Sequence, residues 1–165
     1  MTHAIGDITA GTESVFHQFK GLKFGSPICY EIVFPNLVRG FAKRGANFLV
    51  TITNDGWYGK SSAPYQHFAH AVFRAVENRR FLLRAATTGI SGIIDPYGRI
   101  IRQSELQTQT FLTADITPSD KLTFYTKYGD ILPLASLTLA AIFFILAMIK
   151  KKDERKKHFS PRRIL

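Results

Sequence analysis

The sequence predicts an α/β domain that is followed by one transmembrane helix. Along the chain, an apolar strand, a short turn, a helix and a second strand follow one another, which is the βαβ pattern of a sheet covered by helices. Near the end, residues 131–149 carry no charge and are mainly Leu, Ala, Ile and Phe. This run approaches the ~20 apolar residues that cross a bilayer as a helix. The 165 residues leave room for one domain of ordinary size before it.

The first half of the domain is expected to hold three strands and one helix. Residues 14–19 and 22–28 predict two short strands, and the second is apolar enough to be buried. Pro35 is suited to the first turn of a helix, and Gly45 is suited to its end. Residues 47–53 then predict a third strand. The helix carries four apolar residues on one face: Leu37, Val38, Phe41 and Ala42.

The second half begins with a turn signal at Asn54-Asp55-Gly56 and continues with a helix that has Pro64 in its first turn. Apolar residues recur in this helix at helical spacing and predict a face that packs on the sheet. Four polar residues are expected to lie largely off that face: His67, Arg74, Asn78 and Arg80. Further strands are expected at residues 81–86, 89–94 and 100–103, with an edge strand at 111–115.

Most of the positive charge lies in a C-terminal tail. Residues 150–165 contain eight Lys or Arg and two acidic residues, which accounts for +6 of the net charge of +10. A basic protein is a candidate for nucleic-acid binding, but charge gathered behind an apolar helix argues against that function. By the positive-inside rule, the tail is expected to be cytoplasmic and residues 1–130 to face outward. A buried helix of a soluble protein is the alternative interpretation of the apolar run.

These observations divide the chain into a domain at residues 1–128, a transmembrane helix at 129–150 and a basic tail at 151–165. Residues 1–11 have neither the basic start nor the apolar run of a signal peptide. Export of the domain therefore needs another explanation. Either earlier membrane helices precede this segment, or the C-terminal helix inserts with the whole domain translocated, and the first explanation is simpler.

Cys29 is the first candidate for chemistry. It is the only cysteine in the chain, so it cannot form an intramolecular disulfide and is a candidate free thiol. It follows an apolar strand and precedes a helix, a position from which a nucleophile can project toward a substrate. Free backbone N–H groups at the helix start could stabilise a thiolate and a developing oxyanion. Its position alone also fits an inert core cysteine.

Other residues are candidates for supporting roles. Glu31 is close enough to Cys29 to orient a substrate or share a proton, although a carboxylate at a helix start also occurs without function. Trp57 and Tyr58, in a loop flanked by glycines, could contact a lipid or a peptide, or could simply pack on the domain. His67 and His70 are three residues apart on one helix, but no third ligand accompanies them. Neither a metal nor another cofactor is expected.

The run Gly25-Ser26-Pro27-Ile28-Cys29-Tyr30-Glu31-Ile32-Val33-Phe34-Pro35 resembles the nucleophile segment of the apolipoprotein N-acyltransferases. More motifs of that family follow in its order, and a terminal membrane helix completes them. The resemblance covers residues 7–151. The further motifs are Thr53-Asn54-Asp55-Gly56-Trp57-Tyr58-Gly59, Pro64 with Gln66-His67, Arg74-Ala75-Val76-Glu77, Leu83-Arg84 and Asp95-Pro96-Tyr97-Gly98-Arg99-Ile100.

The resemblance implies a place in the carbon–nitrogen hydrolase superfamily and part of a nitrilase-like αββα sandwich. Cys29 matches the family's nucleophile, which takes an acyl chain from a phospholipid as a thioester and passes it to the amino group of a lipoprotein's diacylglyceryl-cysteine. Glu31 matches a supporting glutamate, and Tyr30 and Trp57 are expected to contact substrate. The resemblance also implies a bacterial inner-membrane protein with a periplasmic catalytic domain and no nucleic-acid partner.

The sequence departs from the family pattern upstream of Cys29. The family's catalytic set also includes a glutamate base and a lysine, both well before the cysteine. The acids before Cys29 are Asp7 and Glu13, the lysines are Lys20 and Lys23, and none lies in a matching context. We therefore expect the missing upstream half of the same enzyme to supply both groups, and the chain alone to be inactive. A nitrilase-type amidohydrolase and a catalytically incompetent membrane remnant are the alternatives.

Overall fold

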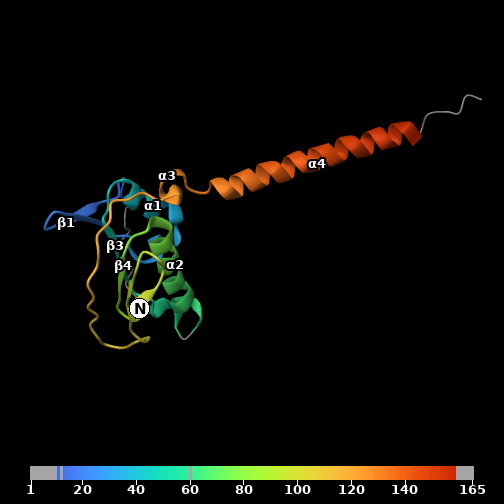
Figure 1. Cartoon of the computed structure of the whole chain (residues 1–165). Helices are drawn as coiled ribbons and strands as arrows, with labels where there is room; N and C mark the ends of the chain where they lie inside the picture. Colours follow the sequence, from blue (N-terminus) through green and yellow to red (C-terminus); the bar gives the residue numbers. More distant parts are fainter. Residues whose placement is uncertain (1–10, 12, 60, 159–165) are drawn as a thin grey trace, which may run out of the picture. The chain divides into compact units, whose positions relative to one another are not determined.

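A six-stranded mixed sheet forms the body of the domain (Figure 1). The computed structural model describes residue 11, residues 13–59 and residues 61–158. The chain divides into two units, Met1–Gly129 and Asp130–Leu165. In the first unit the strands lie side by side in chain order, with parallel pairs in the middle and antiparallel pairs outside. They are β1 Phe16–Phe19, β2 Leu22–Gly25, β3 Phe48–Thr53, β4 Leu82–Ala86, β5 Gly92–Ile94 and β6 Ile100–Gln103.

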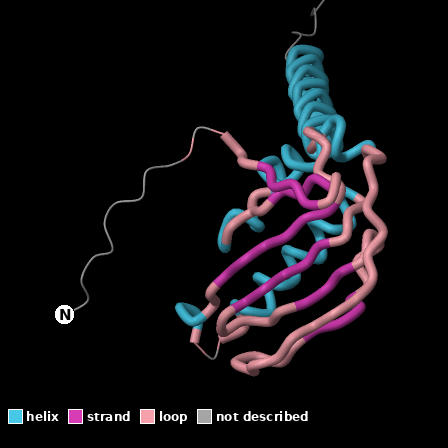
Figure 2. The backbone as a smooth tube through the Cα atoms, turned by 90° about the vertical axis from the view of Figure 1, so that its left-hand side faces the viewer, coloured by secondary structure: helices cyan, strands magenta, loops and turns pink. Residues whose placement is uncertain are grey.

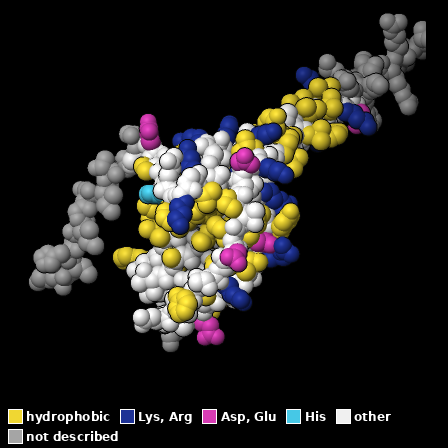
Figure 3. Space-filling view, turned by 60° about the vertical axis from the view of Figure 1, so that its left-hand side comes forward, with side chains coloured by type: hydrophobic (Ala, Val, Ile, Leu, Met, Phe, Trp, Pro, Cys, Tyr) yellow, Lys and Arg dark blue, Asp and Glu magenta, His cyan; other side chains and the backbone are white. Residues whose placement is uncertain are grey.

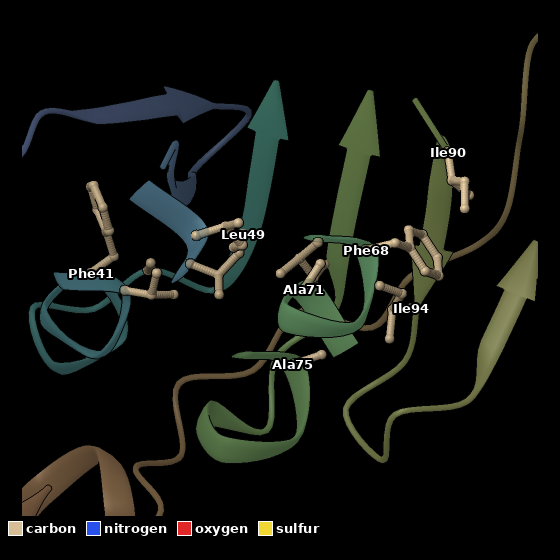
Figure 4. Close-up of a cluster of buried hydrophobic side chains, with 11 residues drawn as sticks. Phe41, Leu49, Phe68, Ala71, Ala75, Ile90 and Ile94 are labelled. Atoms are coloured by element: carbon tan, nitrogen blue, oxygen red, sulfur yellow. The ribbon is translucent and has the colours of Figure 1, made fainter. Parts of the chain in front are cut away.

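Two helices cover one face of this sheet (Figure 2). Helix α1 (Pro35–Lys43) connects β2 to β3, and helix α2 (Ala63–Asn78) connects β3 to β4. Each helix has a proline in its first turn, as the sequence predicted, because proline there lacks only an N–H that would have no partner in the helix. The core between helices and sheet includes Phe41, Leu49, Phe68, Ala71, Ala75 and Ile94 (Figure 4). The predicted α/β class is confirmed.

The side chains of β3 show how the two faces of the sheet differ. Leu49, Thr51 and Thr53 are buried under the helices, whereas Ile52 is 50% exposed on the other face. Successive side chains of a strand point to opposite faces, so β3 presents one face to the core and one away from it. Among the described residues, both covering helices of the sheet lie on the same side (Figure 2). Hydrophobic side chains are visible at the domain surface from a similar direction (Figure 3).

Some predicted strands differ from the structure, and β5 begins at Gly92 rather than at residue 89. The second strand ends at Gly25 rather than Ile28, although Ile28 still makes an isolated parallel bridge to Ile52. Residues 111–115 form no strand, and Phe111 is 86% exposed. Their alternation of apolar and polar residues fits a strand, but sheet pairing needs a partner edge, and here this segment pairs with none of the described strands.

The prediction that four polar residues lie off the packed face of the second helix is wrong. His67, Arg74, Asn78 and Arg80 are all at most 5% exposed. Buried polar groups need hydrogen-bond partners. Asn78 and Arg80 donate to backbone carbonyls, Arg74 donates to Glu77, and His67 contacts Asp55 and the Cys29 carbonyl. Arg80, for example, donates to the carbonyl oxygens of Ala46 and Lys121 at 2.8 and 2.7 Å. It thereby ties the segment that follows the sheet to the start of β3.

A short helix, α3 (Phe124–Tyr128), is fastened to the end of α2 by side-chain hydrogen bonds. The Thr126 hydroxyl is buried and donates to Asn78 Oδ1 at 3.0 Å, while Asn78 Nδ2 donates to the carbonyl of Arg74 at 2.9 Å. The Thr123 hydroxyl caps α3 by accepting from the Thr126 amide at 2.9 Å. Residues just before the apolar helix are therefore held firmly on the domain.

The second unit contains one long helix, α4 (Ile131–His158). Its stretch Ile131–Lys152 is the one helix among the described residues that is long and apolar enough to cross a membrane. No part of that stretch is buried, unlike the core helix of a soluble protein, and apolar side chains cover it (Figure 3). The helix begins at Ile131, at the start of the uncharged run, and continues through residues 151–158, which were expected to belong to the tail.

Candidate active site

Cys29 lies between β2 and α1 as the first residue of a short 3-10 helix, η1 (Cys29–Val33). The bridge between Ile28 and Ile52 brings it beside the end of β3. Its backbone φ is +50°, in the left-handed region that a residue with a side chain rarely adopts. Such a conformation costs of order 1–3 kcal/mol and persists only where the surroundings impose it. Cys29 is thus the strained residue of a turn at the end of the sheet.

Glu31 closes the backbone turn around Cys29. Its Oε2 atom accepts a hydrogen bond from the Ile28 amide at 2.7 Å, and its own amide donates to the Ile28 carbonyl at 3.0 Å. Both bonds join Ile28 to Glu31, so they close the turn that contains Cys29. A carboxylate at this place holds the turn in shape, in addition to the proton-sharing role that stays a prediction for Glu31.

The Cys29 thiol contacts the side chain of Thr53, the last residue of β3. The Thr53 hydroxyl lies 3.3 Å from Cys29 Sγ and 3.0 Å from Asp55 Oδ1. It has a single proton, so it donates to one of these groups at a time. When it donates to sulfur, it stabilises the thiolate form that acts as a nucleophile. The thiol is half-buried, and is therefore open to a reactant.

Asp55 is the centre of a buried charged cluster next to the thiol. Its Oδ1 lies 2.8 Å from His67 Nδ1, and its Oδ2 accepts from Arg84 Nη2 at 2.8 Å. The Asp55 and Arg84 side chains are fully buried and that of His67 is 3% exposed. Burial lowers the pKa of the Arg84 guanidinium below its ordinary value, and the Asp55 carboxylate partly offsets that effect. Breaking such a buried pair by removing one partner typically costs about 3–5 kcal/mol.

His67 joins this cluster to the backbone of Cys29. Its Nε2 atom lies 3.2 Å from the carbonyl oxygen of Cys29. From the sequence, Asp55 was expected in a turn, and the only function considered for His67 was metal binding. The cluster was therefore not predicted. The signal was present as four polar residues in three motifs, but nothing in their spacing showed that the sheet brings them together.

A cavity of about 220 Å³ opens next to the turn that holds Cys29, and its lining includes the following residue, Tyr30. Two tyrosine rings lie close to the ring of His67, which lines the cavity. The ring centroids of Tyr58 and Tyr30 are 5.9 and 6.3 Å from that of His67. Burial, then Cys29 and Asp55, raise the pKa of Tyr58 above 10.0, so its phenol keeps its proton at neutral pH. The lining residues are Tyr30, Val33, Tyr58, Ala63, Gln66, His67 and His70.

The other candidates from the sequence lie differently. Trp57 belongs to a short 3-10 helix, η2 (Gly56–Tyr58), and is 86% exposed, so its substrate contact stays a prediction. His70 lines the cavity. Burial, then Arg74 and His67, lower its pKa below 6.5, which leaves it neutral at pH 7. The described residues hold no cluster of three or more His, Cys, Asp or Glu able to bind a metal.

The two lysines before Cys29 contact groups elsewhere in the domain. Lys23 Nζ donates to the carbonyl of Arg44 at 3.1 Å and lies 4.0 Å from the centre of the Phe16 ring, while Lys20 lies over Phe19. Asp7, one of the two acids before the cysteine, is outside the described residues. These contacts agree with the view that neither lysine serves the thiol.

The sequence matches a family model described as carbon-nitrogen hydrolase over residues 7–121. Curated relatives named apolipoprotein N-acyltransferase are 42% identical in Geobacter metallireducens and 40% identical in Rickettsia bellii. These matches cover 89% and 92% of this chain but only 28% and 30% of those proteins. The chain therefore spans less than a third of the length of these relatives.

Solved structures share the fold at low sequence identity. Nit3 of Saccharomyces cerevisiae, a nitrilase-superfamily member, has a TM-score of 0.53 and 24% identity, over 62% of this chain and 40% of that one. An amidase variant from Nesterenkonia sp. AN1, with acrylamide added to its active-site cysteine, has a TM-score of 0.52 and 21% identity. That match covers 80% of this chain and 51% of the amidase. The predicted nitrilase-like fold is confirmed.

Proposed function

The chain belongs to the carbon–nitrogen hydrolase family, and we propose that it is part of an apolipoprotein N-acyltransferase with Cys29 as its nucleophile. One observation carries the proposal: a half-buried thiol in a strained turn and a helix of membrane-spanning length occur on one chain. A covalent enzyme that moves an acyl chain between two membrane lipids would use both. The names of the curated relatives support the same activity.

The proposed reaction has two steps through a thioester. In the first, the Cys29 thiolate attacks the ester carbonyl of a phospholipid, the C–S bond forms, and the C–O bond to the glycerol breaks. The leaving oxygen takes a proton and departs as lysophospholipid. In the second, the amino group of a diacylglyceryl-cysteine attacks the thioester carbonyl. The C–N bond forms, the C–S bond breaks, and the nitrogen's proton returns to a base. Covalent catalysis divides one difficult transfer into two easier ones.

The residues around Cys29 would have separate roles in this reaction. The Thr53 hydroxyl would stabilise the thiolate, and Glu31 would keep the turn that presents it. Tyr30 and Tyr58 line the cavity next to the Cys29 turn, where a lipid substrate would lie, and the exposed Trp57 would extend this contact surface. A base and an oxyanion-binding lysine would come from the upstream half of the enzyme, because the contacts of Lys20 and Lys23 lie elsewhere.

The proposed location is the bacterial inner membrane, with the domain in the periplasm and the C-terminus in the cytoplasm. The exposed apolar stretch Ile131–Lys152 supports the membrane placement. The orientation rests on the basic residues that follow residue 149. Both proposed substrates, the phospholipid donor and the diacylglyceryl lipoprotein acceptor, are held in the membrane, which explains why the chain would be anchored there.

The test is reconstitution of the thioester. The chain is co-expressed with the upstream part of the Geobacter metallireducens relative, supplied with labelled phospholipid, and analysed by gel autoradiography. We expect a labelled adduct on this chain that hydroxylamine removes, and transfer of label to a lipoprotein acceptor. Cys29→Ser should abolish both signals. Glu31→Gln should slow transfer while leaving some adduct, and Glu105→Gln, at an exposed carboxylate, should change neither.

Two results would contradict the proposal. Acyl transfer that survives Cys29→Ser would show that Cys29 is not the nucleophile. Acylation by this chain alone would show that no upstream half is needed. Release of ammonia from small amides, with no acyl adduct from phospholipid, would favour the amidohydrolase alternative instead.

A further inference from the structure

We propose that His67 is a positioning residue that holds Cys29 in its strained conformation through a hydrogen bond from Nε2 to the Cys29 carbonyl. The proposal concerns the site described above, but it does not depend on which reaction the thiol performs. His67 belongs to α2, and Cys29 begins η1, so the bond links two elements that are far apart in the chain. The distance from Nε2 to the carbonyl oxygen is 3.2 Å.

The contact assigns the proton on the histidine ring. A carbonyl oxygen only accepts, so the nitrogen that faces it must carry hydrogen if the contact is a bond. Nε2 therefore donates to Cys29. On the other side of the ring, Nδ1 lies 2.8 Å from a carboxylate oxygen of Asp55, which also only accepts. The ring thus lies between the Cys29 carbonyl at one end and the buried Asp55–Arg84 pair at the other, where Arg84 Nη2 is also 3.2 Å from Nδ1.

Asp55 and Arg84 fix the plane of that ring. Asp55 uses one oxygen for His67 and the other for Arg84, whose Nε also donates to the carbonyl of Ile90 at 3.1 Å. Arg84 comes from β4 and Asp55 follows β3, so the neighbouring parallel strands set the position of the carboxylate. Since all three side chains are buried, the ring has little freedom to turn away from Cys29.

The bond to the carbonyl acts on a residue that would otherwise relax. Cys29 has a φ of +50°, and a residue with a side chain leaves that region unless neighbouring contacts oppose the change. Glu31 holds the amide side of the turn through Ile28, and His67 holds the carbonyl of Cys29 itself. If the carbonyl were released, the cysteine could move to a negative φ. Its sulfur would then leave the Thr53 hydroxyl.

Two substitutions separate the two ends of the ring. The amide nitrogen of glutamine can take the place of Nε2, so His67→Gln keeps a donor for the Cys29 carbonyl and gives up the contact with Asp55. The amide of asparagine is one carbon shorter and can take the place of Nδ1. His67→Asn therefore keeps the contact with Asp55 and gives up Cys29. His67→Leu removes both.

The readout is the rate at which iodoacetamide alkylates Cys29 in the full chain in detergent micelles. Cys29 is the only cysteine, so labelling reports on one thiol. Because one hydrogen bond is at stake, we expect His67→Gln to stay within about twofold of the parent and His67→Asn and His67→Leu to fall by about fivefold to tenfold. A His17→Gln variant, at an exposed histidine of β1 that does not line this cavity, should match the parent.

Thermal unfolding of each variant provides the structural control. If His67 served only packing or the contact with Asp55, the His67→Asn variant would be alkylated at least as fast as His67→Gln and would be at least as stable. Equal alkylation by all variants, or that reversed order, would overturn the proposal. If the variants do not fold, histidine-labelled parent chain is examined by 15N NMR, and an unprotonated Nε2 on His67 at neutral pH would overturn it as well.

The outcome is separate from that of the proposed function. Alkylation needs neither phospholipid nor an upstream half, so the order of the variants can hold even if no acyl transfer is found. Conversely, acyl transfer that depends on Cys29 could be established while the alkylation order fails.

Discussion

The Thr53 hydroxyl lies 3.3 Å from the sulfur of Cys29, at the point where the last residue of a buried strand meets the strained turn. This contact comes from the pairing of Ile28 with Ile52, because the residue after each of them is then carried to the same edge of the sheet.

Replacing Thr53 by valine keeps the shape of the side chain but removes the hydroxyl that donates to the sulfur. This change should slow alkylation of Cys29 at neutral pH by about fivefold to tenfold. Thr53→Ser keeps the hydroxyl and should stay within about twofold of the parent. The measurement is the rate with iodoacetamide in the full chain. Equal rates for the valine and serine variants would show that the hydroxyl does not act on the sulfur.

Gly89→Ala should disturb the buried cluster without replacing any of its members. A Cβ atom built at Gly89 would collide with the carboxylate of Asp55, which is held on both sides by His67 and Arg84. We expect a loss of about 3–5 kcal/mol in the free energy of unfolding, as for a broken buried ion pair. Chemical denaturation of the full chain in micelles measures it.

The matched control is Gly40→Ala in α1, where a new Cβ atom meets nothing closer than 3.7 Å. Alanine favours a helix over glycine by up to about 1 kcal/mol, so this variant should be as stable as the parent or more so. If both alanine variants behaved alike, Asp55 would not be fixed as tightly as its contacts indicate.

Thr126→Val should loosen α3 from the end of α2. The valine keeps the shape but leaves Asn78 Oδ1 without the donor that now reaches it at 3.0 Å, in a place with no exposure to solvent. The expected cost is about 1–3 kcal/mol, together with faster amide hydrogen exchange in α3. Thr113→Val, at an exposed position of the preceding loop, should have little effect. A similar cost for both variants would contradict the anchoring role of Thr126.

Asp95 should contribute stability that acid removes. Burial alone raises its pKa, but hydrogen bonds from Arg99 and Tyr97 outweigh that effect and hold the pKa below 3.8. A carboxyl group whose pKa is depressed by folding stabilises the fold above its unfolded pKa, and that contribution is lost as the pH falls through the folded value. The stability difference between parent and Asp95→Asn should be constant above about pH 5 and shrink below 3.8. Thermal unfolding at a series of pH values would show this, and a difference that grew with acid would refute it.

A reporter enzyme fused after Leu165 should be active only in the cytoplasm. Six of the eight basic residues after residue 149 lie within about eight positions of the apolar run, and basic residues close to a membrane helix set its orientation. Changing those six residues to glutamine should weaken the preference. Activity of a periplasmic reporter at this position in the unmodified chain would rule out the proposed orientation.

Much of the fold could be predicted from local pattern. Two prolines at helix starts, the apolar strand at residues 47–53 and the uncharged run at 131–149 each depend on neighbouring residues, so the sequence shows them directly. Residues 111–115 were predicted wrongly for the same reason, because their alternation was read without knowing whether a partner edge existed.

The site was predictable only in part. Cys29 and Glu31 stand two residues apart in a motif, and the structure confirms that their backbone segments form one turn. Thr53, Asp55, His67 and Arg84 come from three other segments. Each has a common alternative role as a strand residue, a turn residue or the polar side of a helix, so composition and spacing gave no reason to group them.

The sequence by itself determined that the chain contains an α/β domain, a long apolar helix and one cysteine at a strand-to-helix turn, because these depend on residues close together in the chain. The tertiary structure decided that His67 faces the Cys29 carbonyl and that Asp55 lies between His67 and Arg84. The parallel pairing of β2, β3 and β4 brings these distant residues to one edge of the sheet. Burial there leaves their polar groups no solvent to bind, so they must bind one another.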